Sequence, residues 1–167
     1  MPKPLLQRCS PDSIQEFRLA AEKRYNDGLI LAAQGRRTAA IYLWGYVIEM
    51  TLKAAYFSLI GKGLKDPITW GNDLSPAIQT ARAQGITWPS SGAGHNVLAW
   101  AEWLILSRAN QGSPYASNFS LDVQSQAQRA YTLWRETLRY HKNVAYPTEV
   151  MQMNTAAEWF LTHSRSL

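Results

Sequence analysis

Residues 39–60 form one unbroken stretch, AAIYLWGYVIEMTLKAAYFSLI, that is apolar on nearly every face of a helix. It is long enough to span a bilayer. Its main interruptions are Glu49 and Lys53, which lie four apart on one helical face in the order that favours an ion pair. Near the centre of a bilayer each of these charges would be costly. The stretch therefore predicts the central helix of a protein core and argues against membrane association.

Cap residues, prolines and glycines divide the rest of the chain into further helices. The expected helices run, in chain order, from the Ser10–Pro11 cap to Gly35, from Thr38 to Gly61, from the Ser75–Pro76 cap to Gly85, from His95 to Arg108, from the Ser120 cap to His141, and onward from Pro147 and Thr148. We therefore expect an all-α fold, an up-and-down helical bundle of about five helices plus one short helix. Residues 1–167 form a single domain in this interpretation, with residues 1–9 as a mobile N-terminal segment.

Composition and motifs exclude several classes of protein. With 46% hydrophobic and 17% charged residues the chain is typical of a globular domain. The single cysteine, Cys9, rules out an internal disulfide framework, and no apolar run near the N-terminus predicts a secretory signal, so we expect a cytoplasmic protein. The chain has no phosphate-binding loop, dinucleotide fingerprint, nucleophile elbow or zinc-protease motif, and its three histidines are far apart. We expect no metal and no cofactor.

Basic residues are enriched at the N-terminal end of the chain. The net charge is +5, and residues 1–63 carry nine basic and five acidic residues. This excess favours encounters with phosphates or acidic partners, but it is short of the basic stripe that would by itself indicate nucleic-acid binding.

The helix expected over residues 120–141 carries a candidate phosphate-binding stripe. Arg135, Arg139 and Lys142 fall at i, i+4 and i+7, which places them on one side of a continuous helix. The alternative is an ordinary solvated face, with Glu136 nearby. A glycine-rich loop at residues 90–94 is a second candidate, since it leads into a helix start and its backbone could cradle a phosphate, or it could be a simple connection. At that helix start, we expect His95 and Asn96 to be capping and packing residues of the helix.

The two most apolar helices carry more aromatic residues than a small bundle needs. Since most soluble oligomers are homo-oligomers, we expect a symmetric homodimer whose interface covers this surplus. The residues concerned are Tyr42, Trp44, Tyr46, Tyr56, Phe57, Trp100 and Trp103.

Three sequence features occur in a characteristic order: residues 39–42 and 45–54 with the Glu-x-x-x-Lys pair, then Gly-His-Asn-Val at 94–97, then Leu-Arg-Tyr at 138–140. In this order they resemble the HEPN family (higher-eukaryote and prokaryote nucleotide-binding domain). The resemblance spans about residues 10–165. It implies an all-α bundle that usually dimerises, with members in toxin–antitoxin, phage-defence and nucleotidyltransferase-linked systems. The family-motif residues are Glu49, Lys53, His95, Asn96 and Tyr140.

Three functions are open at this point. The first is a binding module for nucleotide, RNA or a partner protein, in which Arg135, Arg139 and Lys142 face phosphate. The second, implied by the resemblance to metal-independent HEPN ribonucleases, uses His141 to take the 2′-hydroxyl proton and Arg135 to stabilise the charge on phosphate. The third is a structural partner, such as an antitoxin or the companion of a nucleotidyltransferase. Added salt should weaken phosphate binding steeply but not an apolar interface.

Overall fold

Helices make up the regular secondary structure of this chain. The computed structural model describes residue 4 and residues 9–88 and 94–167, and within these ranges it contains no strand. The helices are α1 (Ile14–Ala33), α2 (Arg37–Leu59), the short α3 (Ser75–Ala83), α4 (Val97–Asn110), α5 (Ser117–Leu133) and α6 (Pro147–Thr162), with a π-helical turn η2 (Trp70–Leu74) and a 3-10 turn η3 (Glu136–Tyr140). The expected all-α bundle of five long helices and one short helix is confirmed.

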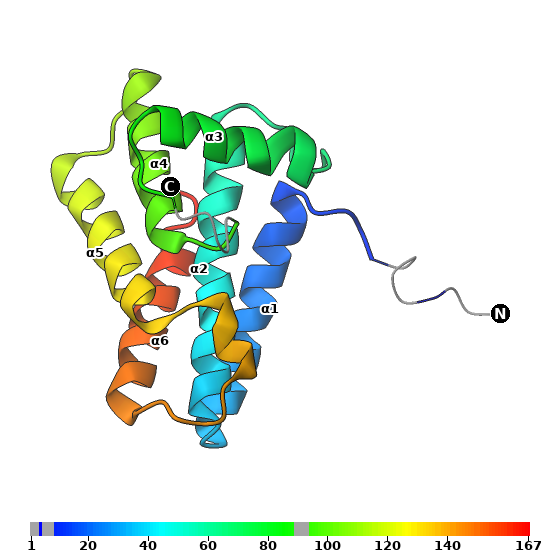
Figure 1. The fold of residues 1–167 in the computed structure, drawn as a ribbon, viewed down its shortest axis with the longest axis vertical. Coiled ribbons are helices and arrows are strands. Elements are labelled where there is room, and N and C mark those ends of the chain that lie inside the picture. The colour runs from blue at the N-terminus through cyan, green and yellow to red at the C-terminus, as the bar shows by residue number, and fades with distance from the viewer. Residues whose placement is uncertain (1–3, 5–8, 89–93) are drawn as a thin grey trace.

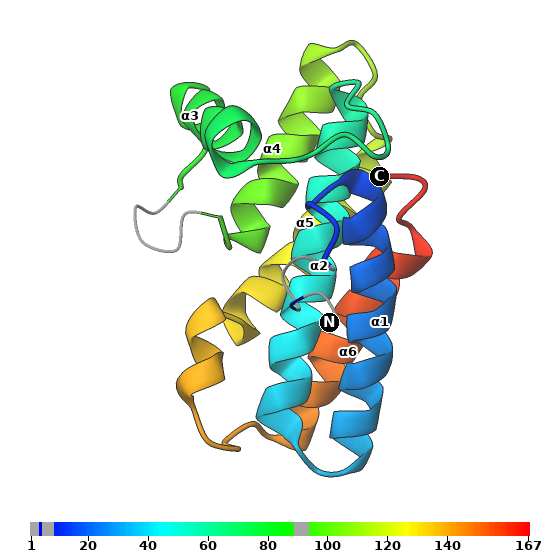
Figure 2. The same cartoon turned by 90° about the vertical axis from the view of Figure 1, so that its right-hand side faces the viewer.

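Helix α2 lies at the centre of the bundle, as its apolar sequence predicts. It packs against α1, α4, α5, α6 and η3. Helix α1 runs antiparallel to α2, and α5 runs antiparallel to both α4 and α6 (Figures 1 and 2). Helices α2 and α4 run in the same direction, because the chain crosses over one end of the bundle through α3. In the described ranges, no helix is long and apolar enough to cross a membrane.

Side-chain caps and glycines set most helix boundaries. Gly35 and Gly61 follow α1 and α2 with φ of 73° and 81°, a left-handed conformation that glycine adopts without strain. The start of α1 differs from the prediction of a cap at Ser10. Ser13 is the N-cap instead, and its hydroxyl oxygen accepts a hydrogen bond from the Glu16 amide at 3.2 Å. The apolar pattern that begins at Ile14 therefore coincides with the true first turn.

The aromatic surplus of α2 and α4 is largely covered within the single chain. Trp44 and Trp100 are 1% and 0% exposed, and Tyr56, Phe57 and Trp103 are also buried. Tyr56 and Phe57 pack against the tryptophan rings of α4, with the Tyr56 and Trp100 centroids 5.6 Å apart, whereas Trp44 packs against Tyr25 of α1. A partner subunit is therefore not required to bury these rings, and the aromatic surplus no longer supports a homodimer. Tyr42 and Tyr46 remain partly exposed.

The expected helix from Ser120 to His141 is wrong at its C-terminal end. Helix α5 ends at Leu133, and Trp134 has an extended backbone with φ −128° and ψ 137°. This turn sends the Trp134 ring into the core, where it is 1% exposed and its Nε1 donates to the Tyr42 carbonyl at 3.0 Å. Gly45 makes room for the ring, since a Cβ on Gly45 would lie 2.1 Å from Trp134 Cδ1. The helix therefore stops before Trp134, and the Trp134 ring is buried in the core.

The chain from Trp134 to Tyr146, called segment 134–146 below, returns to the start of α2. It appears in gold below α5 in Figure 1. Asn143 fastens it, because its Oδ1 accepts from the Thr38 amide at 3.1 Å and its Nδ2 donates to the Gly35 carbonyl at 2.9 Å. The Thr38 hydroxyl oxygen accepts from the Val144 amide at 2.9 Å. Asn143 thus caps α2 from the far end of the sequence.

Candidate functional site

A buried carboxylate binds two basic side chains in the middle of the bundle. Glu49 is 3% exposed and Lys53 is 6% exposed. Lys53 Nζ donates to Glu49 Oε1 at 2.5 Å, and His95 Nδ1 lies 2.9 Å from Glu49 Oε2. We call these three residues the Glu49 cluster. Both carboxylate oxygens are therefore engaged, one by the lysine predicted from helical spacing and one by the histidine.

The geometry of α2 aligns four polar or aromatic side chains. Tyr42, Tyr46, Glu49 and Lys53 occur at i, i+4, i+7 and i+11 of α2, a spacing that keeps them on one face. Neighbouring helices cover the other faces with apolar side chains, so this stripe contains most of the polar groups along the middle of α2. The stripe faces the start of α4 and η3.

The residues before α4 bring His95 to the stripe. Asn96 is the N-cap of α4, and its Oδ1 accepts from the Ala99 amide at 3.0 Å, as its sequence position predicts. Just before it, the Gly94 carbonyl accepts a 3.1 Å hydrogen bond from Trp100 Nε1. Gly94 also lies close to Lys53, since an added Cβ would be 3.9 Å from Lys53 Nζ. These contacts hold the backbone on both sides of His95.

His95 is the part of the cluster that solvent and ligands can reach. Its side chain is 38% exposed, whereas that of Glu49 is 4% exposed. The hydrogen bond to Glu49 raises the pKa of His95, partial burial and the charge of Lys53 oppose this shift, and Glu136 of η3 raises the pKa further. Because the raised pKa favours the imidazolium form, His95 carries positive charge at a higher pH than a free histidine.

Tyr46 connects the cluster to segment 134–146. Its ring packs edge-on against His95 with centroids 5.9 Å apart, and against Trp134 with centroids 5.3 Å apart. Tyr42 stacks edge-on beside it and donates a hydroxyl hydrogen bond to the Tyr46 oxygen at 3.4 Å. Burial is the main cause that raises the pKa of the Tyr46 hydroxyl, with Tyr42 next, so Tyr46 is a neutral hydroxyl at physiological pH.

In η3, Arg139 and Tyr140 form an exposed pair beside these tyrosines. The Arg139 guanidinium carbon lies 4.7 Å from the centroid of the Tyr140 ring, which is 73% exposed. The nearby hydroxyls of Tyr140 and then Tyr42 raise the pKa of Arg139. A cation and an open aromatic face therefore lie next to the α2 stripe that His95 contacts.

The two residues proposed as a catalytic pair are not brought together by a helix. The Arg135 guanidinium lies 3.7 Å from the centroid of the Tyr131 ring, and its Nη1 donates to the Trp134 carbonyl at 2.6 Å and to the Tyr131 carbonyl. His141 and Lys142 are exposed, and their side chains have no hydrogen bond, ion pair or ring contact with residues that the structure describes. The basic stripe Arg135–Arg139–Lys142 therefore does not exist as one helical face.

The structure thus divides the predicted site residues into a group that lies together and a group, Arg135, His141 and Lys142, that forms no common site. Glu49, Lys53 and His95 meet, Asn96 positions His95, and Arg139 and Tyr140 lie nearby through Tyr42. The sequence interpretation missed Tyr42 and Tyr46 as site residues, although their spacing to Glu49 is a visible signal. Most of the proposed phosphate cradle at residues 90–94 and most of the proposed mobile segment at residues 1–9 lie outside the described residues.

No relative supplies a function for this site. Neither family models, nor curated proteins, nor solved structures match the chain. Within the described ranges, no group of three or more histidine, cysteine, aspartate or glutamate residues is placed to hold a metal ion.

Proposed function

We propose that the protein is a binding module for nucleotide or single-stranded RNA, with the phosphate held by His95 and Arg139 and a base stacked on Tyr140. The observation that carries the proposal is the buried Glu49 carboxylate, which hydrogen-bonds a partly exposed His95 and raises its pKa. Tyr46, whose ring packs on His95, links it to Arg139, whose positive charge acts on the Tyr46 hydroxyl. Proteins that bind single strands combine cationic side chains for the backbone with open aromatic faces for the bases.

The arrangement of charges supports a binding role over a purely structural one. Removing an ion pair from water carries a penalty of several kcal/mol per ion, and a well-packed apolar pair is often as stable. A buried ionic cluster with one member at the surface is therefore a candidate for function. Glu49 does not itself face a ligand, and it acts by holding His95 in place and by raising its pKa.

Binding of a fluorescent single-stranded RNA oligonucleotide, followed by anisotropy, tests this proposal. We expect His95→Gln, Arg139→Gln and Tyr140→Ala each to weaken binding by about tenfold, the size of one lost charged hydrogen bond or one lost stacked base. Lys142→Gln is the matched control, since it also removes an exposed cation from segment 134–146, and we expect a much smaller effect. Equal losses for Lys142→Gln and Arg139→Gln would mean non-specific electrostatic binding and would overturn the proposal.

A metal-independent ribonuclease is the second candidate, and the geometry favours His95 over His141 as its base. A carboxylate orients His95, which is the arrangement a general base needs, whereas His141 has no such partner among the described residues. In this mechanism His95 accepts the 2′-hydroxyl proton while that oxygen attacks phosphorus and the 5′-oxygen leaves, taking a proton from water. Arg139 stabilises the added charge on the phosphate.

Cleavage of RNA in excess chelator separates binding from catalysis. Wild type, His95→Gln, Arg135→Ala and His141→Ala should be prepared identically so that a contaminating nuclease is exposed as activity common to all. Loss of cleavage only in His95→Gln supports the His95 mechanism. Loss in Arg135→Ala and His141→Ala restores the pair expected from the HEPN resemblance. Absence of cleavage by wild type leaves the binding module.

Assembly with other chains belongs to the same proposal. A homodimer, and association with a nucleotidyltransferase or with a toxin or antitoxin, remain predictions from the resemblance. Light scattering tests the dimer directly, since it should give a mass near twice 18.8 kDa. If a partner protein binds through an apolar face instead of through phosphate, its affinity should change little with added salt.

A further inference from the structure

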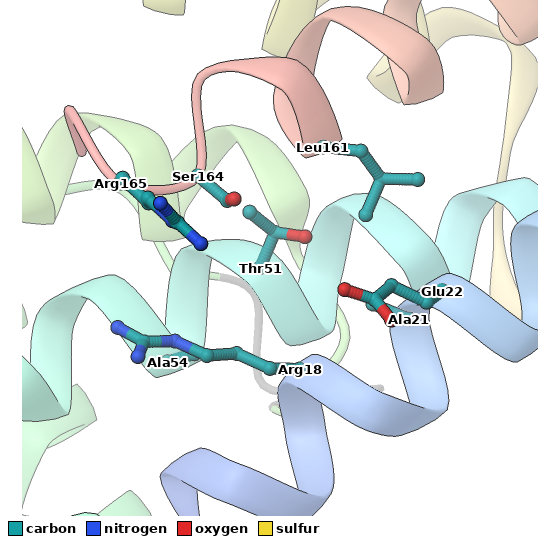
Figure 3. Close-up of a pocket in the computed structure, with 8 residues that line it drawn as sticks. All are labelled: Arg18, Ala21, Glu22, Thr51, Ala54, Leu161, Ser164 and Arg165. Carbon is teal, nitrogen blue, oxygen red and sulfur yellow. The ribbon is translucent and has the colours of Figure 1, made fainter.

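A cavity of about 220 Å³ opens between α1, α2 and the chain that follows α6 (Figure 3). Thr51 and Ala54 of α2 line it. Thr51 is two residues from Glu49, a rotation of roughly 200° around the helix axis, so the cavity lies on the far side of α2 from the Glu49 cluster. It is a separate site and does not depend on the function proposed above.

Two arginines from different elements line one end of this cavity. Arg18 comes from α1 and Arg165 from the turn after α6, and Figure 3 shows both guanidinium groups extending toward the same end. Neither guanidinium has a hydrogen bond or an ion pair with any residue that the structure describes. Two like charges held near each other repel unless an anion lies between them. Arginine pairs of this kind suit the planar, bidentate recognition of phosphate.

A third arginine extends the positive surface. An adjoining cavity of about 170 Å³ shares Arg18, Ser164 and Arg165 and adds Arg108 of α4. The Arg108 guanidinium is held in place, because its Nη1 donates to the Leu167 carbonyl at 3.1 Å and its carbon lies 4.4 Å from the centroid of the Tyr115 ring. Arg108 therefore adds positive charge at the mouth, while Arg18 and Arg165 have donors to offer.

The other end of the cavity differs in chemistry. Ala21 and Leu161 are apolar, and Glu22 places a carboxylate one helical turn beyond Arg18. Glu22 disfavours a second anion at this end and can accept hydrogen bonds from a hydroxyl or amino group. The volume is below the range of roughly 300–1,000 Å³ that is usual for drug-sized ligands, so the occupant is small.

We propose that this cavity binds a small phosphate monoester that carries a hydroxyl or amino group. Its phosphate lies between Arg18 and Arg165 with the Ser164 hydroxyl as a further donor, and its body reaches toward Glu22. The positively charged arginine end and the Glu22 acceptor end give the site a direction. Inorganic phosphate alone would use only the arginine end.

Calorimetric titration of the full chain with inorganic phosphate and with glycerol 3-phosphate tests this site. We expect Arg18→Gln and Arg165→Gln each to weaken both ligands by tenfold or more, since each removes a charge-assisted hydrogen-bond donor. Arg36→Gln is the matched control, because it removes an exposed arginine outside the cavity, and His95→Gln controls for the other site. Both controls should bind as wild type does.

Glu22→Gln tests the direction of the ligand. Inorganic phosphate should bind this variant more tightly, because a repelling carboxylate is gone, whereas the preference for glycerol 3-phosphate over phosphate should shrink. No binding of either probe to wild type at millimolar concentration, or equal binding by wild type and the two arginine variants, would overturn the proposal. Thermal unfolding followed by circular dichroism checks that each variant is folded. If Arg18→Gln does not fold, Arg165→Gln alone tests the site.

Discussion

Glu49 and Lys53, and Arg135 and Arg139, are two pairs of charged residues with the same spacing of four in the sequence, but they have different outcomes in the structure. The first pair is in the middle of α2, where the helix continues and the two side chains meet at 2.5 Å. The second pair lies beyond the end of α5, where Trp134 leaves the helix and Arg135 turns back onto Tyr131. A spacing of four places side chains together only where the helix continues, and continuation is decided by contacts with other elements.

Removing the Glu49 carboxylate should have the largest effect on stability. In Glu49→Gln, Lys53 remains buried without a counter-charge, and breaking a buried ion pair in this way typically costs about 3–5 kcal/mol of unfolding free energy. Urea denaturation measures the loss. Glu158→Gln, an exposed glutamate on α6, is the control and should change stability by no more than about 0.5 kcal/mol. A similar small change for Glu49→Gln would mean that the two regions differ less than the structure indicates.

Crowding Trp134 should break the contact that ends α5. In Gly45→Ala, the added Cβ would lie 2.1 Å from the Trp134 ring, so the ring or α2 must move. Overpacking of this kind costs about 1–3 kcal/mol, which denaturation followed by tryptophan fluorescence detects. Gly71→Ala is the control, because its Cβ meets nothing within 4 Å. If Gly45→Ala is as stable as Gly71→Ala, the close packing of Trp134 on α2 is wrong.

Asn143→Ala should detach segment 134–146 from the start of α2. The variant loses the hydrogen bonds to the Thr38 amide and the Gly35 carbonyl, and loss of a helix cap costs about 1 kcal/mol. Hydrogen exchange at the Thr38 amide should become faster. The neighbouring change Lys142→Ala removes no contact that the structure describes and should leave this exchange rate unaltered; equal acceleration in both variants would contradict the capping role.

The smallest expected effect is a pH dependence of stability from His95. Its pKa is raised above the ordinary value of 6.5 by the hydrogen bond to Glu49. Its contribution to stability is therefore complete below pH 6.5 and is lost as the pH rises through the higher pKa of the folded state. Thermal unfolding between about pH 5 and pH 8 should show this decline in wild type and a weaker one in His95→Gln. Identical profiles would mean that His95 is not held by Glu49.

The segment around Trp134 explains why part of the candidate site was predicted wrongly. Trp134 and Leu138 occur in the apolar positions of the expected helix, and both are indeed packed against the core, but from an extended residue and a 3-10 turn. The helical spacing of these two residues agrees with their burial, but an extended residue and a 3-10 turn bury them in place of a helix, and His141, three residues beyond Leu138, is exposed. Gly45, which admits the Trp134 ring, is about ninety positions away, and no local pattern connects the two.

By itself, the sequence determined the helical class, the central position of residues 39–60 and the pairing of Glu49 with Lys53. These features depend on interactions within one or two helical turns and on apolar residues that have to leave water. Only the tertiary structure decided that His95 completes the Glu49 cluster, where α5 ends, and that Arg18 and Arg165 share a cavity. Each of these depends on groups far apart in the chain, whose contacts exist only once the helices have packed around α2.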